Sequence, residues 1–131
     1  MKKMDKRALG TAPEGVLLFS ELEMRINNVL LTIGVPSHTL GFKYLREAVR
    51  LVFNDPNYLQ VITKGLYSDI AKKFDTTAIR VERAIRHAVV ASSKNNITAL
   101  NSFLRNDILK PNAKPSNSEF IALLEIAIRT P

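Results

Sequence analysis

Apolar residues recur at helical spacing along most of this chain, and no stretch shows the alternation of apolar and polar residues that is typical of a strand. The pattern is clearest at residues 66–94, where two helical segments are joined by the sequence Asp-Thr-Thr. In each segment the apolar side chains share one face and leave the opposite face to polar residues. The inward positions are Leu66, Ile70, Ala71 and Phe74 in the first segment, and Val81, Ala84, Ile85, Ala88 and Ser92 in the second.

The three residues between these segments favour a tight turn. Asp75, Thr76 and Thr77 are poor helix-interior residues, and their short side chains cap helices by bonding to free backbone N–H groups. Two helices joined in this way, with their apolar faces packed together, predict a helix-turn-helix unit, whose second helix enters the major groove of DNA.

The outward face of the second helix carries Arg80, Arg83, Arg86 and His87, with Glu82 beside them. Guanidinium groups are planar, two-pronged donors that match the acceptors on the major-groove edge of guanine. We therefore expect base contacts from this set, above all from Arg83 and Arg86, which lie one turn apart. Arg80, Glu82 and His87 are expected to make flanking contacts or to orient the others. On pattern alone, the alternative is an ordinary helical hairpin with a solvated basic face.

Residues around the turn suit phosphate groups. Thr76 and Thr77 lie at the start of the second helix, where free N–H groups and the helix dipole favour an anion. Lys72, Lys73 and Lys114 are the expected phosphate partners beside them.

Capping signals divide the rest of the chain into further helices. Gly34 and Pro36 end the first of these, because glycine adopts the left-handed cap and proline blocks continuation. Asp55 followed by Pro56 starts a short helix that leads to the helix-turn-helix. Asn96 is expected to cap a separate helix. The helices expected outside the helix-turn-helix are residues 16–33, 38–54, 56–62, 96–108 and 120–129.

The last helix begins with a predicted capping box, in which Ser116 and Glu119 each accept a hydrogen bond from the backbone N–H group of the other. It follows a loop at residues 110–117 that is rich in proline and lysine. Because no strand pattern or repeat is present, the predicted fold class is all-α, with about six helices, a helix-turn-helix and no sheet.

The length of 131 residues suits one domain with its own core. We expect a flexible basic tail at residues 1–15 and a single helical DNA-binding domain at residues 16–131, with the helix-turn-helix at about residues 66–94. No apolar run approaches the roughly 20 residues that span a bilayer. The chain has no cysteine, which suits a cytoplasmic protein.

The formal net charge of +7 is concentrated on the predicted helix-turn-helix. Residues 63–94 hold seven Lys and Arg against three Asp and Glu, a surplus of four, which is more than half of the excess. A surface that faces phosphates needs an excess of positive charge, whereas a surface that faces only solvent does not.

Nothing in the sequence favours an enzyme. The two histidines, His38 and His87, lie far apart, and no glycine-rich phosphate loop, metal-spaced cluster or nucleophile motif is present. We therefore expect no catalytic residue, no cofactor and no metal.

Three stretches of the chain match a known family. They read IGVPSHTLGFKYLREAVRLVFND at residues 33–55, ITKGLYSDIAKKFDTTAIRVERAIRHAV at residues 62–89 and AKPSNSEFIALL at residues 113–124. Over about residues 26–129 the chain strongly resembles the C-terminal effector domain of the sporulation initiation response regulator (the stage 0 sporulation protein A family), the master transcription factor of endospore-forming bacteria.

This resemblance implies an all-helical, six-helix domain whose helix-turn-helix reads a short promoter element, usually as paired copies on DNA. The family regulator also carries an N-terminal phosphoacceptor domain, for which this chain has no room. In the family, the outward-facing residues of the motif RVERAIRHA contact bases and phosphates. The residues of this sequence to which that role carries over are Arg80, Glu82, Arg83, Arg86 and His87.

A rival interpretation is a protein-binding regulator, or an antagonist that pairs with a full-length regulator or with RNA polymerase. The last helix is apolar nearly all round, which favours full burial in the core; the alternative is a protein interface around Phe120 and Leu124. One recognition helix reads only a few base pairs, so we expect monomers in solution and weak self-association on DNA. The expected partners are double-stranded DNA, RNA polymerase and a second copy of the chain.

Overall fold

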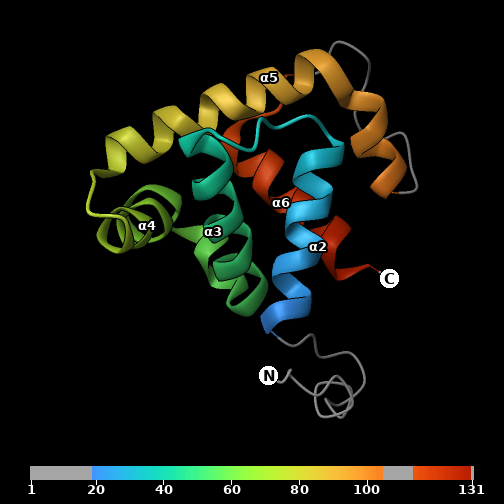
Figure 1. Ribbon diagram of the computed structural model, residues 1–131. Coiled ribbons are helices and arrows are strands. Elements are labelled where there is room, and N and C mark those ends of the chain that lie inside the picture. Colours follow the sequence, from blue (N-terminus) through green and yellow to red (C-terminus); the bar gives the residue numbers. More distant parts are fainter. Residues whose placement is uncertain (1–18, 105–113, 131) are drawn as a thin grey trace, which may run out of the picture.

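The computed structural model describes residues 19–104 and 114–130 (Figure 1). Within these residues there are five α-helices: α2 (Phe19–Thr32), α3 (Leu40–Asn54), α4 (Ser68–Lys73), α5 (Ala78–Leu104) and α6 (Asn117–Arg129). Between α3 and α4 lie a 3₁₀ helix, η1 (Pro56–Gln60), and a π-helical turn, η2 (Ile62–Tyr67). No strand occurs in the described parts, and the predicted all-α class is confirmed. The tail expected at residues 1–15 lies outside them.

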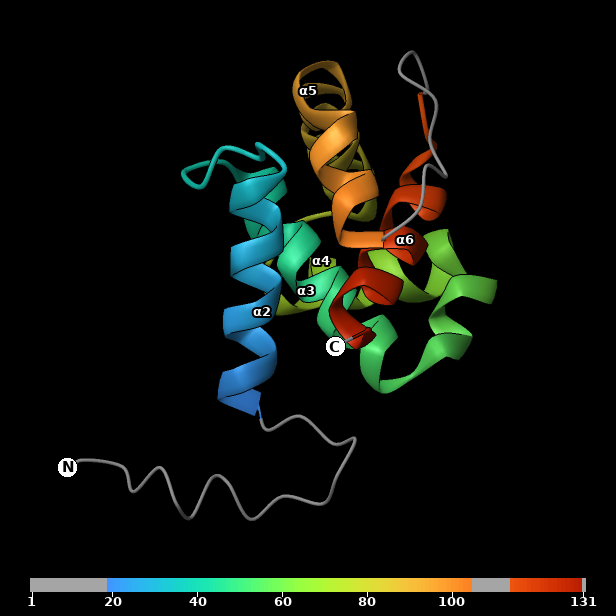
Figure 2. The same cartoon turned by 90° about the vertical axis from the view of Figure 1, so that its right-hand side faces the viewer.

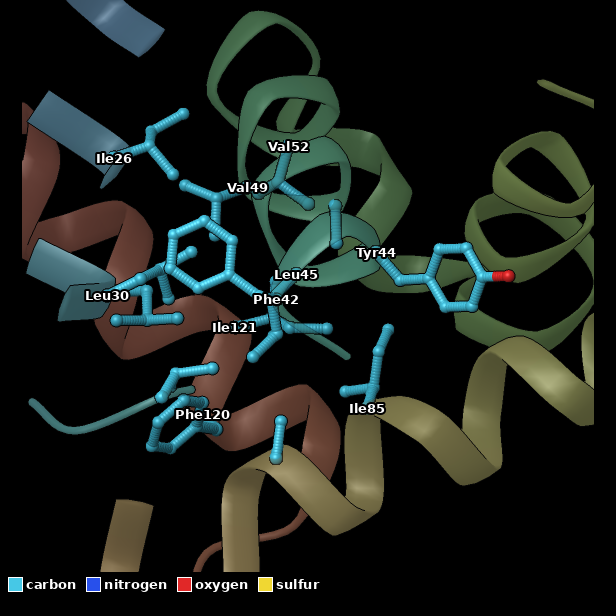
Figure 3. Packing of buried hydrophobic residues seen from close by; sticks show 14 of the residues in the cluster. Ile26, Leu30, Phe42, Tyr44, Leu45, Val49, Val52, Ile85, Phe120 and Ile121 are labelled. Atoms are coloured by element: carbon cyan, nitrogen blue, oxygen red, sulfur yellow. The ribbon is translucent and has the colours of Figure 1, made fainter. Parts of the chain in front are cut away.

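Helix α3 lies at the centre of the molecule and packs against α2, α5 and α6 (Figures 1 and 2). Apart from Glu47, its buried residues are apolar or glycine, so that each neighbouring helix can bury its own apolar face against it. Figure 3 shows this core, in which α2 contributes Ile26 and Leu30, α3 contributes Phe42, Leu45 and Val49, α5 contributes Ile85, and α6 contributes Phe120 and Ile121. Burial of these apolar side chains stabilises the packing of α5 against α3.

Two of the predicted caps form as expected. Gly34 has φ of 90°, and the following N–H group of Val35 donates to the carbonyl oxygen of Leu30 at 3.0 Å, which closes the end of α2. At the start of α6, the Ser116 hydroxyl accepts from the Glu119 N–H group at 3.2 Å, and the Glu119 carboxylate accepts from the Ser116 N–H group at 2.8 Å. The capping box is therefore confirmed.

The structure corrects the prediction of two separate helices on either side of Asn96, because α5 runs without a break from Ala78 to Leu104. An asparagine inside a helix costs only about 0.7 kcal/mol or less relative to alanine. No glycine or proline lies in this stretch to force a break. The short helix expected after Asp55 is also different, because it takes a 3₁₀ form and ends at Gln60.

Among the described residues, no helix is both long enough and apolar enough to cross a lipid bilayer.

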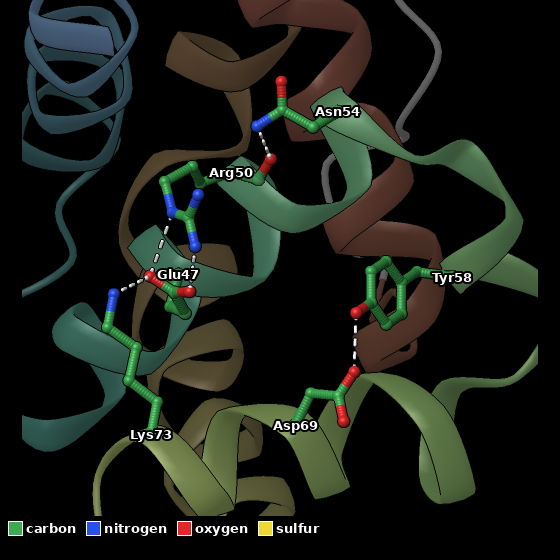
Figure 4. Close-up of polar contacts among 6 residues, drawn as sticks. All are labelled: Glu47, Arg50, Asn54, Tyr58, Asp69 and Lys73. Atoms are coloured by element: carbon green, nitrogen blue, oxygen red, sulfur yellow. Dashed lines mark hydrogen bonds and ion pairs between the residues drawn. The ribbon is translucent and has the colours of Figure 1, made fainter.

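A buried carboxylate joins α3 to α4 (Figure 4). Glu47 of α3 is 6% exposed, and it accepts hydrogen bonds from Arg50 of the same helix and from the Lys73 ammonium of α4, the latter at 2.8 Å. Burial opposes ionisation of Glu47, but the hydrogen bonds and charges of Arg50 and Lys73 outweigh it and hold its pKa below the ordinary value of 4.5. In the same region the Tyr58 hydroxyl of η1 donates to the Asp69 carboxylate of α4 at 2.5 Å. These contacts fix α4 against the centre of the fold.

Replacing Glu47 with glutamine should destabilise the protein by about 1–3 kcal/mol at neutral pH, because a buried charged network loses its acceptor charge. The folded-state pKa of Glu47 is lowered, so its contribution is complete above the unfolded value of about 4.5 and is lost as the pH falls through the folded value. Urea unfolding between neutral pH and about pH 3 should therefore show a steeper loss of stability in the wild type than in the Glu47→Gln variant. Parallel pH profiles would contradict this role of the carboxylate.

Candidate nucleic-acid interface

The helix-turn-helix lies at one end of the molecule, where α4 and the first turns of α5 meet beside α3 (Figure 1). Asp75 in the turn has φ of 53°, the left-handed conformation that glycine usually supplies at this point. The next N–H group, that of Thr76, donates to the carbonyl oxygen of Ala71 at 2.9 Å and closes the turn. Aspartate tolerates this backbone better than most residues with a side chain. The chain therefore makes the turn without a glycine.

The inward face of α5 is buried as its spacing predicts. Val81 and Ile85 are fully buried, and Ala88 is 5% exposed. Further along, the buried hydroxyl of Ser92 donates to the carbonyl oxygen of Ile33 at 2.9 Å, which ties α5 to the end of α2. Along its inward side, α5 thus packs against α3, α4 and α6 and is bonded to the end of α2.

At its closest approach, α5 touches α3 through backbone atoms. A Cβ atom added to Gly41, in the first turn of α3, would come within 2.6 Å of the carbonyl oxygen of Ala84 and 2.8 Å of the Cβ of Ala88. Only glycine fits this crossing without a shift of one helix. The outward face of α5 is therefore presented at an angle that the core determines.

That outward face carries the residues expected to contact bases. Arg80, Arg83, Arg86 and His87 are all exposed, and Glu82 is partly exposed. One oxygen of the Glu82 carboxylate lies 3.7 Å from the Arg86 guanidinium. A solvent-exposed pair at this distance is weak, so it can orient Arg86 without holding it away from a ligand. The structure brings all five residues onto the surface of the second helix of the motif.

Of the residues expected to contact phosphates, some are exposed, and others are half-buried or already bonded within the fold. Lys72 and Lys114 are exposed, and the exposed Thr77 accepts a hydrogen bond from the Arg80 N–H group at 3.2 Å, as a helix cap does. Thr76 is half-buried. Lys73 is bonded to Glu47, so its charge already serves the contact between α3 and α4. The sequence did not indicate this use of Lys73, because its partner lies 26 residues away.

The start of α6 is bonded to the motif through one side chain. The amide nitrogen of Asn117 donates to the Tyr67 hydroxyl at 3.1 Å and to the carbonyl oxygen of Glu82 at 3.2 Å. Burial raises the pKa of Tyr67 above its ordinary value. A single asparagine outside any periodic pattern gives no signal in the sequence, and this link was not predicted.

An open hollow of about 480 Å³ lies beside Arg86, between η2, α5 and the start of α6. Thr63, Ser116 and Ser118 are among the residues that line it. Hydroxyls next to an arginine suit a phosphate backbone. The sequence indicated Ser116 only as a helix cap and gave no signal for Thr63 or Ser118, because a single short polar side chain fits no apolar periodicity.

A comparison with known protein families matches residues 26–128 to the family described as sporulation initiation factor Spo0A C terminal. The matched range contains all of α3, α4 and α5, and therefore the whole helix-turn-helix. The chain belongs to this family. Its members are DNA-binding effector domains and not a known enzyme family. In the described parts of the chain, no group of three or more His, Cys, Asp or Glu side chains is placed to hold a metal ion.

The structure rejects the alternative of a protein interface around Phe120 and Leu124 and agrees with their burial in the core. Phe120 is fully buried and Leu124 is 1% exposed, so neither side chain reaches the surface of the folded chain. Both belong to the core around α3, which explains why α6 is apolar nearly all round. Of its apolar residues, Ile126 is 38% exposed. Phe120 and Leu124 are thus packing residues.

Replacing Lys72 with alanine should lower the slope of log affinity against log salt concentration by about one unit and leave the sequence preference unchanged, because a phosphate contact releases counterions without reading bases. Lys114→Ala should behave in the same way. Lys73→Ala is the contrasting variant, since it should chiefly lower stability through Glu47. Fluorescence anisotropy on one duplex at several salt concentrations measures the slopes. An altered preference with an unchanged slope would rule out the phosphate assignment.

Proposed function

We propose that this protein is a sequence-specific double-stranded DNA-binding transcription regulator. The observation that carries the proposal is the pair of exposed arginines, Arg83 and Arg86, one turn apart on the second helix of a motif whose other face is locked into the core. Two-pronged donors at this position match the major-groove edge of guanine. Membership of a DNA-binding family supports the same conclusion.

In this mechanism the start of α5 enters the major groove. Arg83 and Arg86 contact bases, Arg80 and His87 make flanking contacts, and Glu82 orients Arg86. Lys72, Lys114 and Thr77 contact phosphates on either side and fix the position of α5 along the duplex. No step of this mechanism requires a cofactor.

Selection of bound duplexes from a random pool is the direct test. The wild type should enrich a short common sequence, and it should bind that sequence at least about a thousandfold more tightly than random DNA. If the pool stays random although the protein binds DNA, the arginines contact only the backbone and the proposal of sequence specificity fails.

We further propose that the protein is monomeric in solution and pairs weakly on DNA. A single recognition helix reads too few base pairs to stand out from competing sites, and two adjacent copies would roughly double the sequence that is read. Light scattering without DNA, followed by titration onto duplexes with one and two sites, tests this. A tight dimer without DNA, or equal affinity per site on both duplexes, would contradict it.

Contact with RNA polymerase is the corresponding proposal for activation, and pull-down of the polymerase on promoter DNA would test it.

A further inference from the structure

The exposed midline of α5 carries two apolar side chains in addition to its arginines. Ile79, Arg83, Arg86 and Val90 follow one another at i, i+4, i+7 and i+11, so they form a single stripe along the helix. Ile79 is 69% exposed and Val90 is 60% exposed. The stripe lies opposite the buried residues of α5, so it faces directly away from the core.

Packing does not account for Ile79. It belongs neither to the buried apolar cluster nor to the partly buried side chains around it. It lies in the first turn of α5, directly before Arg80 and one turn before Arg83. In a helix-turn-helix, the N-terminal residues of the second helix are those that reach base edges. A large apolar group at this position therefore lies where DNA contacts are made.

We propose that Ile79 is a specificity-determining residue that contacts the C5-methyl group of a thymine. This inference deepens the proposed function, because it rests on α5 entering the major groove. The thymine methyl is the apolar group that the major groove displays, and aliphatic side chains are suitable partners for it. The stripe then combines two arginines, which suit guanine, with an isoleucine, which suits an adjacent A·T pair.

Val90 provides a matched control on the same helix. It has similar exposure and lies on the same stripe, but it is eleven residues further along. At about 1.5 Å per residue, Val90 lies roughly 16 Å beyond Ile79. The major groove is only about 12 Å wide, so a helix that inserts its first turns does not bring Val90 to the same bases.

The experiment uses the DNA site selected by the wild-type protein. Each thymine is replaced in turn by deoxyuridine, which lacks only the C5-methyl group, and affinities are measured for the wild type, Ile79→Ala and Val90→Ala. One replacement should weaken wild-type binding about fourfold, the ratio expected for one methyl group removed from water. Ile79→Ala should bind the thymine and deoxyuridine duplexes equally, whereas Val90→Ala should keep the wild-type ratio.

Each result decides the question. The inference is overturned if no deoxyuridine weakens the wild type, or if Ile79→Ala retains the same fourfold ratio. Failure of the proposed function would be distinguishable, because the wild type would then select no common site before any deoxyuridine is introduced. Since Ile79 is exposed and alanine is a good helix former, Ile79→Ala should fold normally, and its circular dichroism and melting temperature verify this.

Discussion

Alanine at Arg83 should weaken binding to the selected DNA site by about 1–3 kcal/mol and relax the base preference at one position. The side chain is exposed at the centre of the α5 stripe, and nothing in its surroundings needs it for packing. Arg86→Ala should have an effect of the same size at a neighbouring position. The salt bridge between Glu82 and Arg86 spans 3.7 Å at the surface, so its loss should change stability very little.

Two comparisons make this result specific to base reading. Affinities are measured on the selected duplex and on random duplexes, because loss of a phosphate contact would weaken both equally. Arg129→Gln is a control at the end of α6: it removes a positive charge that is bonded to the buried Glu125 carboxylate, so urea unfolding must first show how much stability the variant loses. Arg129→Gln should leave the base preference unchanged. If Arg83→Ala and Arg86→Ala weaken the selected and random duplexes by the same factor, the arginines do not read bases.

The features predicted correctly from the sequence are those that depend on local spacing. The buried stripe of α5 through Val81, Ile85 and Ala88 follows from helical periodicity, which needs no knowledge of the partner helix. The left-handed Gly34 and the capping box of Ser116 are likewise set by a few adjacent residues. This is why the all-α class and the helix-turn-helix could be derived before the structure.

The errors and omissions involve residues that are distant in the sequence or weak in their local signal. The pairing of Lys73 with Glu47 depends on how α4 sits against α3, which periodicity does not give. Asn96 has the chemistry of a cap, but a long helix can absorb the small cost of an asparagine. Burial of Phe120 depends on how many neighbours surround α6, and an apolar helix alone does not distinguish a core from an interface.

The same reason explains why only part of the candidate site could be proposed from the sequence. Arg83 and Arg86 could be assigned because the buried face of α5 fixes the direction in which they point. Thr63 and Ser118 line the same hollow as Arg86 only because η2 and α6 fold next to α5. The helical spacing already placed Ile79 near the DNA-facing side of α5, and the structure shows how far it is exposed, at 69%.

The contact between α3 and α5 makes Gly41 the position where one methyl group should have the largest effect on the whole unit. In an exposed helix, replacing glycine with alanine stabilises by about 0.5–1 kcal/mol. Here the new Cβ would lie 2.6 Å from the backbone oxygen of Ala84, which cannot move without moving α5. Overpacking of this kind typically costs about 1–3 kcal/mol and occasionally more, so the two effects have opposite signs and the steric one dominates.

Gly41→Ala should therefore lower the free energy of unfolding, and it should weaken DNA binding even where the variant is folded, because α5 is displaced from the angle that presents Arg83. Gly65→Ala is the control: its Cβ would meet mainly the side-chain atom Cγ2 of Val61, at 2.6 Å, and Val61 is 51% exposed and able to yield. Urea unfolding and binding to the selected duplex measure both variants. A Gly41→Ala variant that is as stable as the wild type and binds the selected site as tightly would show that the crossing of α3 and α5 does not fix the recognition helix.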